Sequence, residues 1–392
     1  MQGKIILKKG KEYSIQRFHP WVFSGAIHSA EGDLTDGCWV AVHSSKNTLL
    51  GSGHYQKGSI TVRILSFENL PGDDFWIAKL KKALELRKNA GLPSATTNCF
   101  RLIHGEGDGL PGLIVDYYNG IAIVQAHSIG MHVDRHKIAA ALVQLLGTEL
   151  TSVYYKSQTT VPGRDRENFA DEYLYGMGAI PHLVIENGNK FFVDWEEGQK
   201  TGFFLDQRDN RQLVAQYSPG KKVLNTFCYS GGFSVYALSA QATVVHSVDS
   251  SEKAIELTRS NIEVNGFNLL QNPCYTEDVF EFLKDKGDAY DIIVLDPPAF
   301  AKHRDARHQA VKGYQRLNAQ AMKSIRAGGI IFTFSCSQVV DKKLFYDTVV
   351  SAAIQAGRNI KVLHHLSQAP DHPVSIFHPE GEYLKGLVLY VE

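Results

Sequence analysis

A repeating order of strand, glycine turn and helix fills the chain from about residue 220 onward. Its strands are short apolar runs bounded by turns: KVLNTF, TVVHSVD, YDIIVLD and GGIIFTFS. Apolar runs without polar alternation are typical of parallel strands that are covered on both faces. Between them lie helical stretches such as SEKAIELTRSNIEVNG, which starts at Ser250 or Ser251 and stops at Gly266. This order predicts a doubly wound α/β sheet.

The remaining stretches predict a chain of three domains, because 392 residues are too many for one compact core. Residues 1–72 hold short β-rich runs broken by glycine, as in a small barrel. Residues 73–185 mix helix and strand, and residues 186–392 form the third predicted domain, which opens with an Asn187-Gly188 hairpin turn. The C-terminal tail adds two further strands separated by a loop that contains proline and glycine.

Composition limits the class of protein and the kinds of site. No apolar run approaches the roughly 18 residues that span a bilayer, and MQGKIILKKGKEY lacks the apolar core of a signal peptide. The sequence therefore predicts a cytoplasmic protein that does not enter the membrane. Its five cysteines are widely spaced, so we expect neither a disulfide framework nor a metal site. A cysteine with a function is expected to act as a thiol.

The stretch VLNTFCYSGGFSVYAL, residues 223–238, predicts a strand, a tight loop and a helix. Gly231 lets the backbone pass close to a ligand, and the N-terminus of the helix attracts negative charge. The loop does not match G-x-G-x-x-G, because Asn225, Phe227 and Tyr229 stand where that pattern needs other residues. A cradle for pyrophosphate is therefore poorly supported.

Acidic residues follow the next strands of the predicted sheet. Asp249 ends the second strand, where a carboxylate can accept hydrogen bonds from a ribose diol. Asp278 follows the third strand and could meet an adenine edge, although the cap of a helix is an equal alternative for it. Asp296 follows the fourth. An acidic residue placed to bind a ribose, without a loop that would bind a pyrophosphate, indicates an adenosine ligand such as S-adenosylmethionine.

Five stretches together resemble one family: GQKTGFFLDQRDNR, NTFCYSGGFS, VDSSEKAIELTRSNIEVNG, DIIVLDPPAFAK and FTFSCSQ. Residues 220–392 are similar to a class I methyltransferase domain. Over its whole length the chain resembles the bacterial ribosomal RNA large-subunit 5-methylcytosine methyltransferases, and RFHPWVFSGAI, residues 17–27, resembles the start of their PUA domain. The fold implied is a Rossmann-like class I methyltransferase domain with a C-terminal β-hairpin, preceded by a small PUA-like β-barrel and a central α+β domain.

This resemblance implies S-adenosylmethionine as cofactor, large-subunit ribosomal RNA as partner, and a possible homodimer. Arg208 would meet the methionine carboxylate, although a structural ion pair of Asp206 with Arg208 or Arg211 is the alternative. The cofactor-binding residues that we expect are Phe204, Asp206, Gln207, Arg208, Asn225, Phe227, Tyr229, Ser230, Gly231, Asp249, Asp278 and Asp296.

Cytosine C5 is a poor nucleophile, and a thiolate that adds at C6 makes it able to take a methyl group. Cys336, at the end of the predicted fifth strand, is expected to supply that thiolate; the alternative is a buried small apolar residue. Asp296 is expected to hold N3 and the exocyclic amine of cytosine, with a turn-forming role before proline as its alternative. Cys228, inside the cofactor loop, is the rival thiol.

Two basic clusters are expected to contact RNA phosphates, although a solvated basic face is the alternative for each. The formal net charge of +0 shows that any such binding must be local. The residues that we expect to contact RNA are Lys9, Arg17 and Trp21 near the N-terminus, and Lys302, Arg304 and Arg307 after the fourth strand.

Three other functions compete with formation of 5-methylcytosine. A methyltransferase that modifies an exocyclic amine of guanine or adenine would also explain DPPAF, and it would need no thiol. An RNA-binding protein with an inactive methyltransferase domain is the second, and the acids at three strand ends oppose it. A NAD-dependent oxidoreductase is disfavoured because the glycine pattern is missing.

Overall fold

The computed structural model describes residues 2–68, 71–162, 169–286, 289–301 and 303–392, apart from the side chain of Arg304. The chain divides into two compact units, each built from separate stretches. The first unit comprises residues 1–182, 193–203 and 370–381, and the second comprises residues 183–192, 204–369 and 382–392. In the described part of the chain, no helix has both the length and the apolar composition needed to cross a bilayer.

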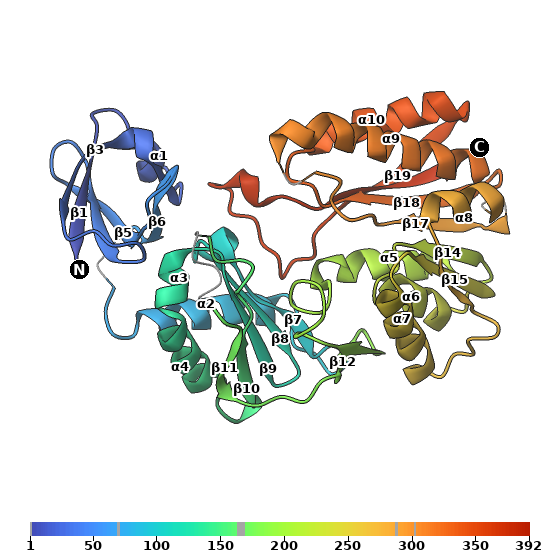
Figure 1. Cartoon of the computed structure of the whole chain (residues 1–392), viewed down its shortest axis with the longest axis horizontal. Helices are drawn as coiled ribbons and strands as arrows, with labels where there is room; N and C mark the ends of the chain where they lie inside the picture. The colour runs from blue at the N-terminus through green and yellow to red at the C-terminus, as the bar shows by residue number, and fades with distance from the viewer. Residues whose placement is uncertain (1, 69–70, 163–168, 287–288, 302) are drawn as a thin grey trace. The chain divides into compact units, whose positions relative to one another are not determined.

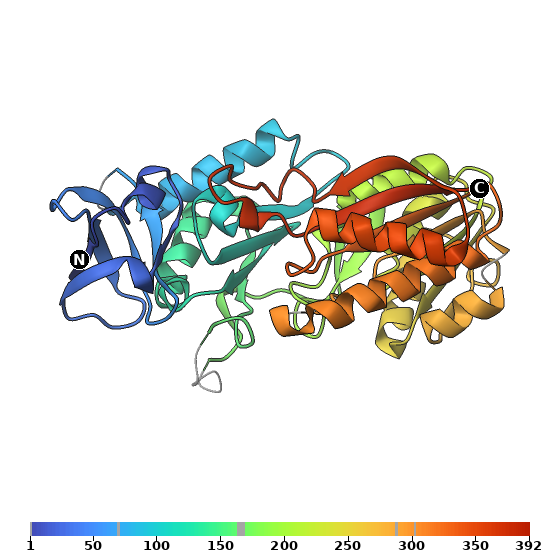
Figure 2. The ribbon, with the colours of Figure 1, turned by 90° about the horizontal axis from the view of Figure 1, so that it is seen from above.

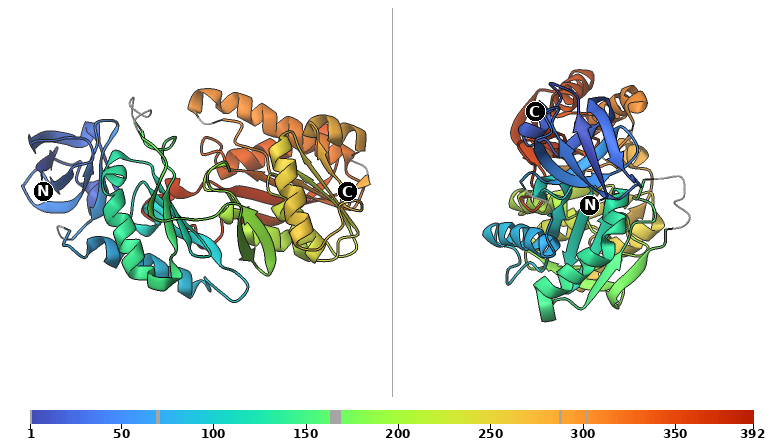
Figure 3. Two further views of the ribbon diagram at one scale, coloured as in Figure 1. Left: turned by 60° about the horizontal axis from the view of Figure 1, so that its bottom comes forward. Right: turned by 90° about the vertical axis from the view of Figure 1, so that its left-hand side faces the viewer.

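The first unit begins with a small barrel-like sheet of strand order β2-β6-β5-β4-β1-β3. Its strands curve round one another in both views of Figure 3. Apolar side chains such as Ile5, Val40 and Val62 belong to its buried core. The short helix α1 (Tyr13–Gln16) crosses between strands. The strands are β1 (Gly3–Leu7), β2 (Trp21–Phe23), β3 (Ile27–Gly32), β4 (Trp39–His43), β5 (Leu49–Tyr55) and β6 (Ile60–Ser66).

A second sheet of the first unit has the order β11-β10-β9-β8-β7, in which only β9 and β10 pair in parallel among the described strands. Helices α2 (Phe75–Asn89), α3 (Ile129–Val133) and α4 (Arg135–Leu146) accompany it, and they share one apolar core with its strands. The strands are β7 (Cys99–His104), β8 (Leu113–Tyr118), β9 (Ile121–Ala126), β10 (Ser152–Tyr155) and β11 (Glu172–Gly176).

The second unit is built on a seven-stranded sheet of order β16-β15-β14-β17-β18-β20-β19. The first five strands in that order pair in parallel, as the apolar runs predicted. A two-stranded hairpin, β12 (His182–Glu186) and β13 (Asn189–Val193), precedes the sheet and turns at Asn187-Gly188. The sheet strands are β14 (Lys222–Thr226), β15 (Val244–Asp249), β16 (Cys274–Thr276), β17 (Ile292–Leu295), β18 (Gly329–Ser335), β19 (Ile360–Ser367) and β20 (Lys385–Val391).

Helices cover both faces of this sheet, so the predicted doubly wound class is confirmed (Figure 1). The tail strand β20 lies between β18 and β19 and runs antiparallel to both, which confirms the expected C-terminal hairpin; the two red strands lie side by side in Figure 2. The helices are α5 (Arg208–Tyr217), α6 (Gly232–Ser239) and α7 (Glu252–Val264) on one face, and α8 (Val279–Lys286), α9 (Arg307–Ser324) and α10 (Lys342–Ala356) on the other.

A buried ion pair joins the hairpin to the first helix of the second unit. Nε and Nη2 of Arg211, on α5, donate to the two carboxylate oxygens of Glu186, each over 2.8 Å. Both side chains are buried, and the hydroxyl of Tyr236 donates to the same carboxylate over 2.9 Å. The remaining terminal nitrogen of Arg211 donates to the carbonyl of Phe204 over 2.9 Å, so the pair also anchors the segment that leads into α5.

We expect Glu186→Ala to destabilise the second unit by about 3–5 kcal/mol, because it leaves the Arg211 guanidinium buried without its counter-charge. Urea unfolding monitored by tryptophan fluorescence measures the change. Glu256→Ala is the matched control, since Glu256 is exposed on α7 and its loss should cost less than about 0.5 kcal/mol. Equal urea midpoints for the two variants would contradict the assignment.

Candidate active site

The parallel strands of the second unit bring several predicted site residues to one edge of the sheet. Thr226, the last residue of β14, pairs with Val248 of β15 and with Leu295 of β17. The residues that follow these partners, Asp249 and Asp296, therefore lie at the same level on either side of the loop after β14. Ligands of open α/β sheets bind at this carboxyl edge.

The loop after β14 bends sharply because three of its residues adopt left-handed backbone angles. The φ angles are 54° at Phe227, 47° at Tyr229 and 70° at Gly231. The amide of Tyr229 donates to the Asp249 carboxylate over 3.1 Å, and the amide of Ser251 donates to the other oxygen over 3.0 Å. The loop and the acid of the neighbouring strand are thus held together.

Helix α7 holds this loop from the other side. The hydroxyl of Thr258 donates to the carbonyl of Tyr229 over 3.0 Å, and the amide group of Asn261 donates to the carbonyl of Ser230 over 2.8 Å. The approach is so close that a Cβ at Gly231 would lie 2.7 Å from the Thr258 Cγ2. Glycine is therefore required here both for its backbone angle and for space.

Asn225 lies deeper than the rest of this group, within β14, and it is buried. Its side-chain nitrogen donates to the Ser234 hydroxyl over 2.9 Å. Its side-chain oxygen finds no hydrogen-bond partner among the described residues. A buried side-chain oxygen of Asn225 that lacks a donor near the end of β14 is consistent with a hydrogen bond from a polar group of a bound ligand.

The segment from Phe204 to Arg208 is tied to the same edge. The Phe204 ring meets that of Tyr229 edge-on, with centroids 5.2 Å apart. The side-chain nitrogen of Gln207 donates to the Asp296 carboxylate over 3.0 Å. Asp206 accepts a hydrogen bond of 2.6 Å from the hydroxyl of Tyr383.

Arg208 begins α5 and is buried, with its Nε 3.5 Å from Asp209. Asp278 is exposed and caps α8 through hydrogen bonds of 2.9 Å and 3.2 Å from the amides of Phe280 and Glu281. Asp278 therefore has the helix-capping role that was the alternative in the sequence analysis, and its contact with adenine stays a prediction.

The five cysteines differ in access. Cys336 is partly exposed, whereas Cys38, Cys99, Cys228 and Cys274 are buried. Burial raises the pKa of the Cys228 thiol well above its usual value, with a smaller opposing effect from its hydrogen bond to Thr258. A buried thiol that resists ionisation is a poor nucleophile, so Cys336 is the better candidate.

Asp296 and Cys336 follow neighbouring strands, since Leu295 of β17 pairs with Thr333 of β18. Both residues influence the pKa of Tyr314, on α9. Burial raises this pKa to about 12, and the negative charges of Cys336 and Asp296 contribute to the increase. Tyr314 therefore stays a neutral phenol within the electrostatic influence of both candidate catalytic groups. No motif marked it in the sequence.

Lys385 is a second residue that the sequence reasoning missed. It is buried in β20, and its Nζ donates to the carbonyls of Ser337 and Val340, each over 2.6 Å. The sequence feature that could have identified it is a single lysine in the apolar run LKGLVLYV. Lysine is almost never fully buried unless it is paired.

The RNA-contact candidates lie on both units. Lys9 and Arg17 are exposed on the first unit, and the indole nitrogen of Trp21 donates to Glu106 over 2.9 Å. On the second unit Arg307 is half-exposed and lies 3.7 Å from Asp341. Lys302 lies outside the described residues, as does the side chain of Arg304.

Next to Arg17 the first unit exposes aromatic rings. Phe18, Phe23 and Phe377 are each about half exposed, at 51%, 46% and 49%. The Phe18 ring lies 5.2 Å from that of Phe377, and its backbone φ is 64°. We call Phe18, Phe23 and Phe377 the aromatic patch.

Beside this patch, His19, His378 and Glu380 offer possible metal-ligand atoms within 4.8 Å of one another. The amide of Trp21 donates to the Nδ1 of His19 over 3.2 Å. The Nε2 of a neutral His19 must then carry the proton, and a protonated nitrogen cannot bind a metal. This arrangement favours a hydrogen-bonding role for His19.

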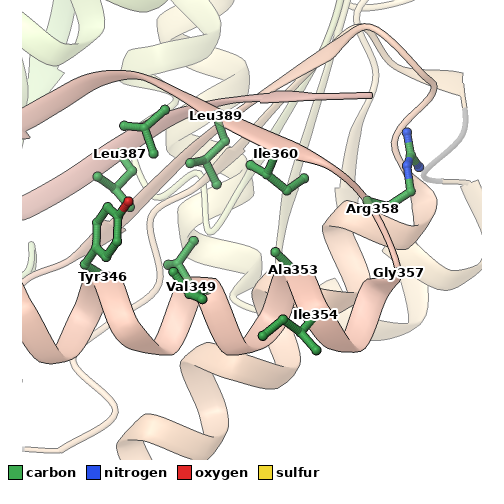
Figure 4. A pocket seen from close by; sticks show the side chains of 11 residues that line it. Tyr346, Val349, Ala353, Ile354, Gly357, Arg358, Ile360, Leu387 and Leu389 are labelled. Carbon is green, nitrogen blue, oxygen red and sulfur yellow. The ribbon is translucent and has the colours of Figure 1, made fainter.

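An apolar groove of about 270 Å³ lies between α10 and the strands β19 and β20 (Figure 4). Tyr346, Val349, Ile354 and Leu389 are among the side chains that line it. Its wall is mostly apolar, with Arg358 and the Tyr346 hydroxyl as its polar groups, which suits an apolar contact better than nucleophilic or acid–base chemistry.

Comparison with known proteins decides the family. Residues 100–379 match the model of the S-adenosylmethionine-dependent methyltransferases, which is well over half of the chain, and residues 5–67 match a PUA-like domain. The chain belongs to the S-adenosylmethionine-dependent methyltransferase family. The expected methyltransferase fold with an N-terminal PUA-like domain is thereby confirmed.

The methyltransferase also has relatives that align over its full length. Ribosomal RNA large subunit methyltransferase I of Aeromonas hydrophila is 40% identical over 99% of this chain and 99% of the relative. The protein of the same name from Alteromonas mediterranea is 38% identical over 100% of this chain and 99% of the relative.

Solved structures agree with this assignment. A protein solved in complex with SAH, and described as a methyltransferase, has a TM-score of 0.85 and 25% identity, and the match covers 99% of this chain and 100% of the other. A Streptococcus mutans protein described as a SAM-dependent methyltransferase has a TM-score of 0.83 and 24% identity, with coverage of 99% and 100%. At 24% identity, this second match shows similarity of the fold alone.

The carboxyl edge of the methyltransferase fits S-adenosylmethionine, the cofactor of its family. The backbone at Gly231 leaves room that a Cβ would fill, and Asn225 presents an unsatisfied oxygen among the described residues. Asp249 ends β15, the second strand of the domain along the chain, where a ribose is held in folds of this type.

We expect Gly231→Ala to weaken S-adenosylmethionine binding by about tenfold or more, because alanine there strains the backbone and collides with Thr258. Isothermal titration calorimetry measures the affinity. Gly220→Ala is the control: its φ of 71° is equally strained, but no atom lies within 4 Å of the added Cβ. If both variants bind like the parent protein, the loop does not approach the cofactor.

Proposed function

We propose that the methyltransferase forms 5-methylcytosine in large-subunit ribosomal RNA through a covalent adduct with Cys336. The observation that carries this proposal is the partly exposed thiol of Cys336, which directly follows β18, while Asp296 directly follows the neighbouring strand β17. The full-length relatives named ribosomal RNA large subunit methyltransferase I support the choice of RNA. Cytoplasmic location follows for an enzyme with that substrate.

The cofactor would lie along the loop after β14. Asp249 would accept hydrogen bonds from its ribose, and Arg208 would pair with its methionine carboxylate. The ring of Phe204, fixed against Tyr229, would cover the cofactor from the segment before α5. When bound, S-adenosylmethionine supplies an electrophilic methyl group on a sulfonium sulfur.

Cys336 would start the reaction. Its thiolate adds to C6 of cytosine, and the electrons of the C5–C6 double bond move to C5, which then takes the methyl group as the bond from sulfur to methyl breaks. Loss of the C5 proton to water or hydroxide re-forms the double bond and expels the thiolate of Cys336. The products are 5-methylcytosine, S-adenosylhomocysteine and a proton.

Asp296 would accept a hydrogen bond from the exocyclic amine of the target cytosine and, when its other carboxyl oxygen carries a proton, donate one to N3 while negative charge builds on the ring. Its carboxylate already accepts a hydrogen bond from Gln207, which fixes its orientation before a base arrives. The neutral phenol of Tyr314 lies near both Asp296 and Cys336 and would limit access of water to the adduct.

A cytosine inside folded RNA must be swung out of its stack, which costs a few kcal/mol. Contacts elsewhere on the RNA would offset that cost. Lys9, Arg17 and Arg307 are exposed or half-exposed and would meet phosphates, while the aromatic patch would stack on unpaired bases. In this proposal residues 1–72 act as an RNA-binding domain and residues 186–392 as the catalytic one, joined by residues 73–185.

A homodimer is part of the proposal. The groove between α10 and β19 exposes apolar side chains, of which Ile354 is 77% and Val350 43% exposed. β19 is also the edge strand of the sheet. An exposed edge beside apolar surface is typical of an interface between copies.

RNA that contains 5-fluorocytidine should form a covalent adduct with the methyltransferase in the presence of S-adenosylmethionine, because fluorine blocks the loss of a proton from C5. Denaturing gel electrophoresis and intact mass measurement detect the adduct. We expect Cys336→Ser to abolish it and to lower methyl transfer by at least about 10³-fold.

Cys228→Ser is the matched control, and it should still form the adduct. Methyl transfer that survives Cys336→Ser nearly unchanged would instead favour modification of an exocyclic amine, which requires no thiol. Absence of transfer to any RNA, with S-adenosylmethionine still bound, would favour a non-catalytic RNA-binding protein.

Replacing both Phe18 and Phe377 by alanine should weaken binding of a single-stranded RNA oligonucleotide by about tenfold or more, because each ring is expected to stack on a base. Fluorescence anisotropy at fixed salt measures this affinity. Tyr346→Ala, which removes an aromatic ring that is 40% exposed in the α10 groove, is the control. Unchanged affinity in the double variant argues against the aromatic patch as an RNA surface.

A further inference from the structure

The strand β20 begins with a buried ammonium group. Lys385 is only 5% exposed, in a strand that otherwise reads GLVLYV. Its Nζ donates to the carbonyl oxygens of Ser337 and Val340, each over 2.6 Å. Both acceptors belong to the turn that begins at Cys336, so the lysine binds this turn at two points.

The same turn is held at further points. Lys385 pairs with Ser335, the residue directly before Cys336, in the antiparallel register of β18 and β20. The Ser337 hydroxyl donates to the carbonyl of Ala301 over 2.9 Å. Cys336 therefore lies between a strand residue fixed by the sheet and a turn fixed by the ammonium group.

Burial disfavours the charged form of Lys385, and nearby negative groups oppose this effect. Burial lowers the pKa of Lys385 to about 8, while the negative charge of Cys336 is the largest influence that raises it again. Asp341 and Glu382 also raise the pKa, and Lys342 lowers it. A neutral side chain of similar length would avoid the desolvation cost.

We propose that Lys385 is a positioning residue: it fixes the turn that presents Cys336, and its positive charge favours the thiolate form of that sulfur. This inference rests on the proposed role of Cys336 as nucleophile. A cation beside a thiol favours the ionised form, and the thiolate is the form that attacks. Lys385 would thus act on the reaction through Cys336 and not by touching the RNA.

The test measures the rate at which iodoacetamide alkylates Cys336 in the full chain, without RNA or cofactor, by intact mass. Cys336→Ser gives the background from the four buried cysteines. Lys385→Gln keeps a donor but removes the charge, and we expect alkylation at pH 7 to be about tenfold slower. Lys385→Arg keeps the charge, and its rate should stay within about threefold of the parent protein.

The pH dependence gives a signature that a structural role would not produce. Below about pH 8 Lys385 carries its proton, so the parent protein should react faster than Lys385→Gln. As the pH rises through that value the charge is lost, and the two rates should converge. Lys342→Gln, which removes a half-exposed lysine paired with Glu382 in the same region, should match the parent protein throughout.

Alkylation of Lys385→Gln at the parental rate from pH 6 to pH 9 would overturn the inference, whether or not its melting temperature falls. If that variant does not fold, Lys385→Arg decides: a tenfold slower rate in folded protein also overturns it. Failure of the proposed function looks different. Parent protein would then form no adduct with 5-fluorocytidine RNA, while its alkylation still depended on Lys385.

Discussion

The active edge of this methyltransferase depends on the pairing of its parallel strands. Because Thr226 pairs with both Val248 and Leu295, the residues next in the chain, Asp249 and Asp296, reach the edge together. A slip of one residue would turn alternate side chains to the opposite face of the sheet. The apolar contacts that fix the strands between two layers of helices therefore also fix the spacing of the polar groups.

Side chains from outside the strand ends then hold these groups in place. Thr258 and Asn261 of α7 bind carbonyls of the cofactor loop, Gln207 binds Asp296, and Lys385 binds the turn after Cys336. Each contact satisfies a polar group that would otherwise lose its hydrogen bonds on burial. A site whose loops are bonded before a ligand arrives has less to reorganise during the reaction.

The two compact units are interleaved along the chain. Residues 193–203 and 370–381 belong to the first unit, although second-unit residues precede and follow each of them. The last stretch, 382–392, carries β20, which pairs with β18 and contains Lys385. The catalytic sheet thus lacks an inner strand until the end of the chain is present, so its folding requires contacts between residues far apart in sequence.

Local sequence determined much of this molecule. Short apolar runs and glycine turns predicted the doubly wound sheet, and the loop pattern around Gly231 with Asp249 predicted an adenosine ligand without pyrophosphate. These features follow from neighbouring residues, since strand periodicity and backbone angles are local properties. The likeness of five separate stretches to one family then predicted the cofactor, which the family match bears out.

Tertiary structure alone decided which polar residues surround Cys336. Tyr314 lies within α9 and Lys385 at the start of the last strand, and nothing in their immediate sequence connects them to position 336. They reach it only because β20 inserts beside β18 and α9 packs on the sheet. Access to the thiols was equally hidden, because burial of Cys228 and exposure of Cys336 depend on which helices and strands cover each strand end.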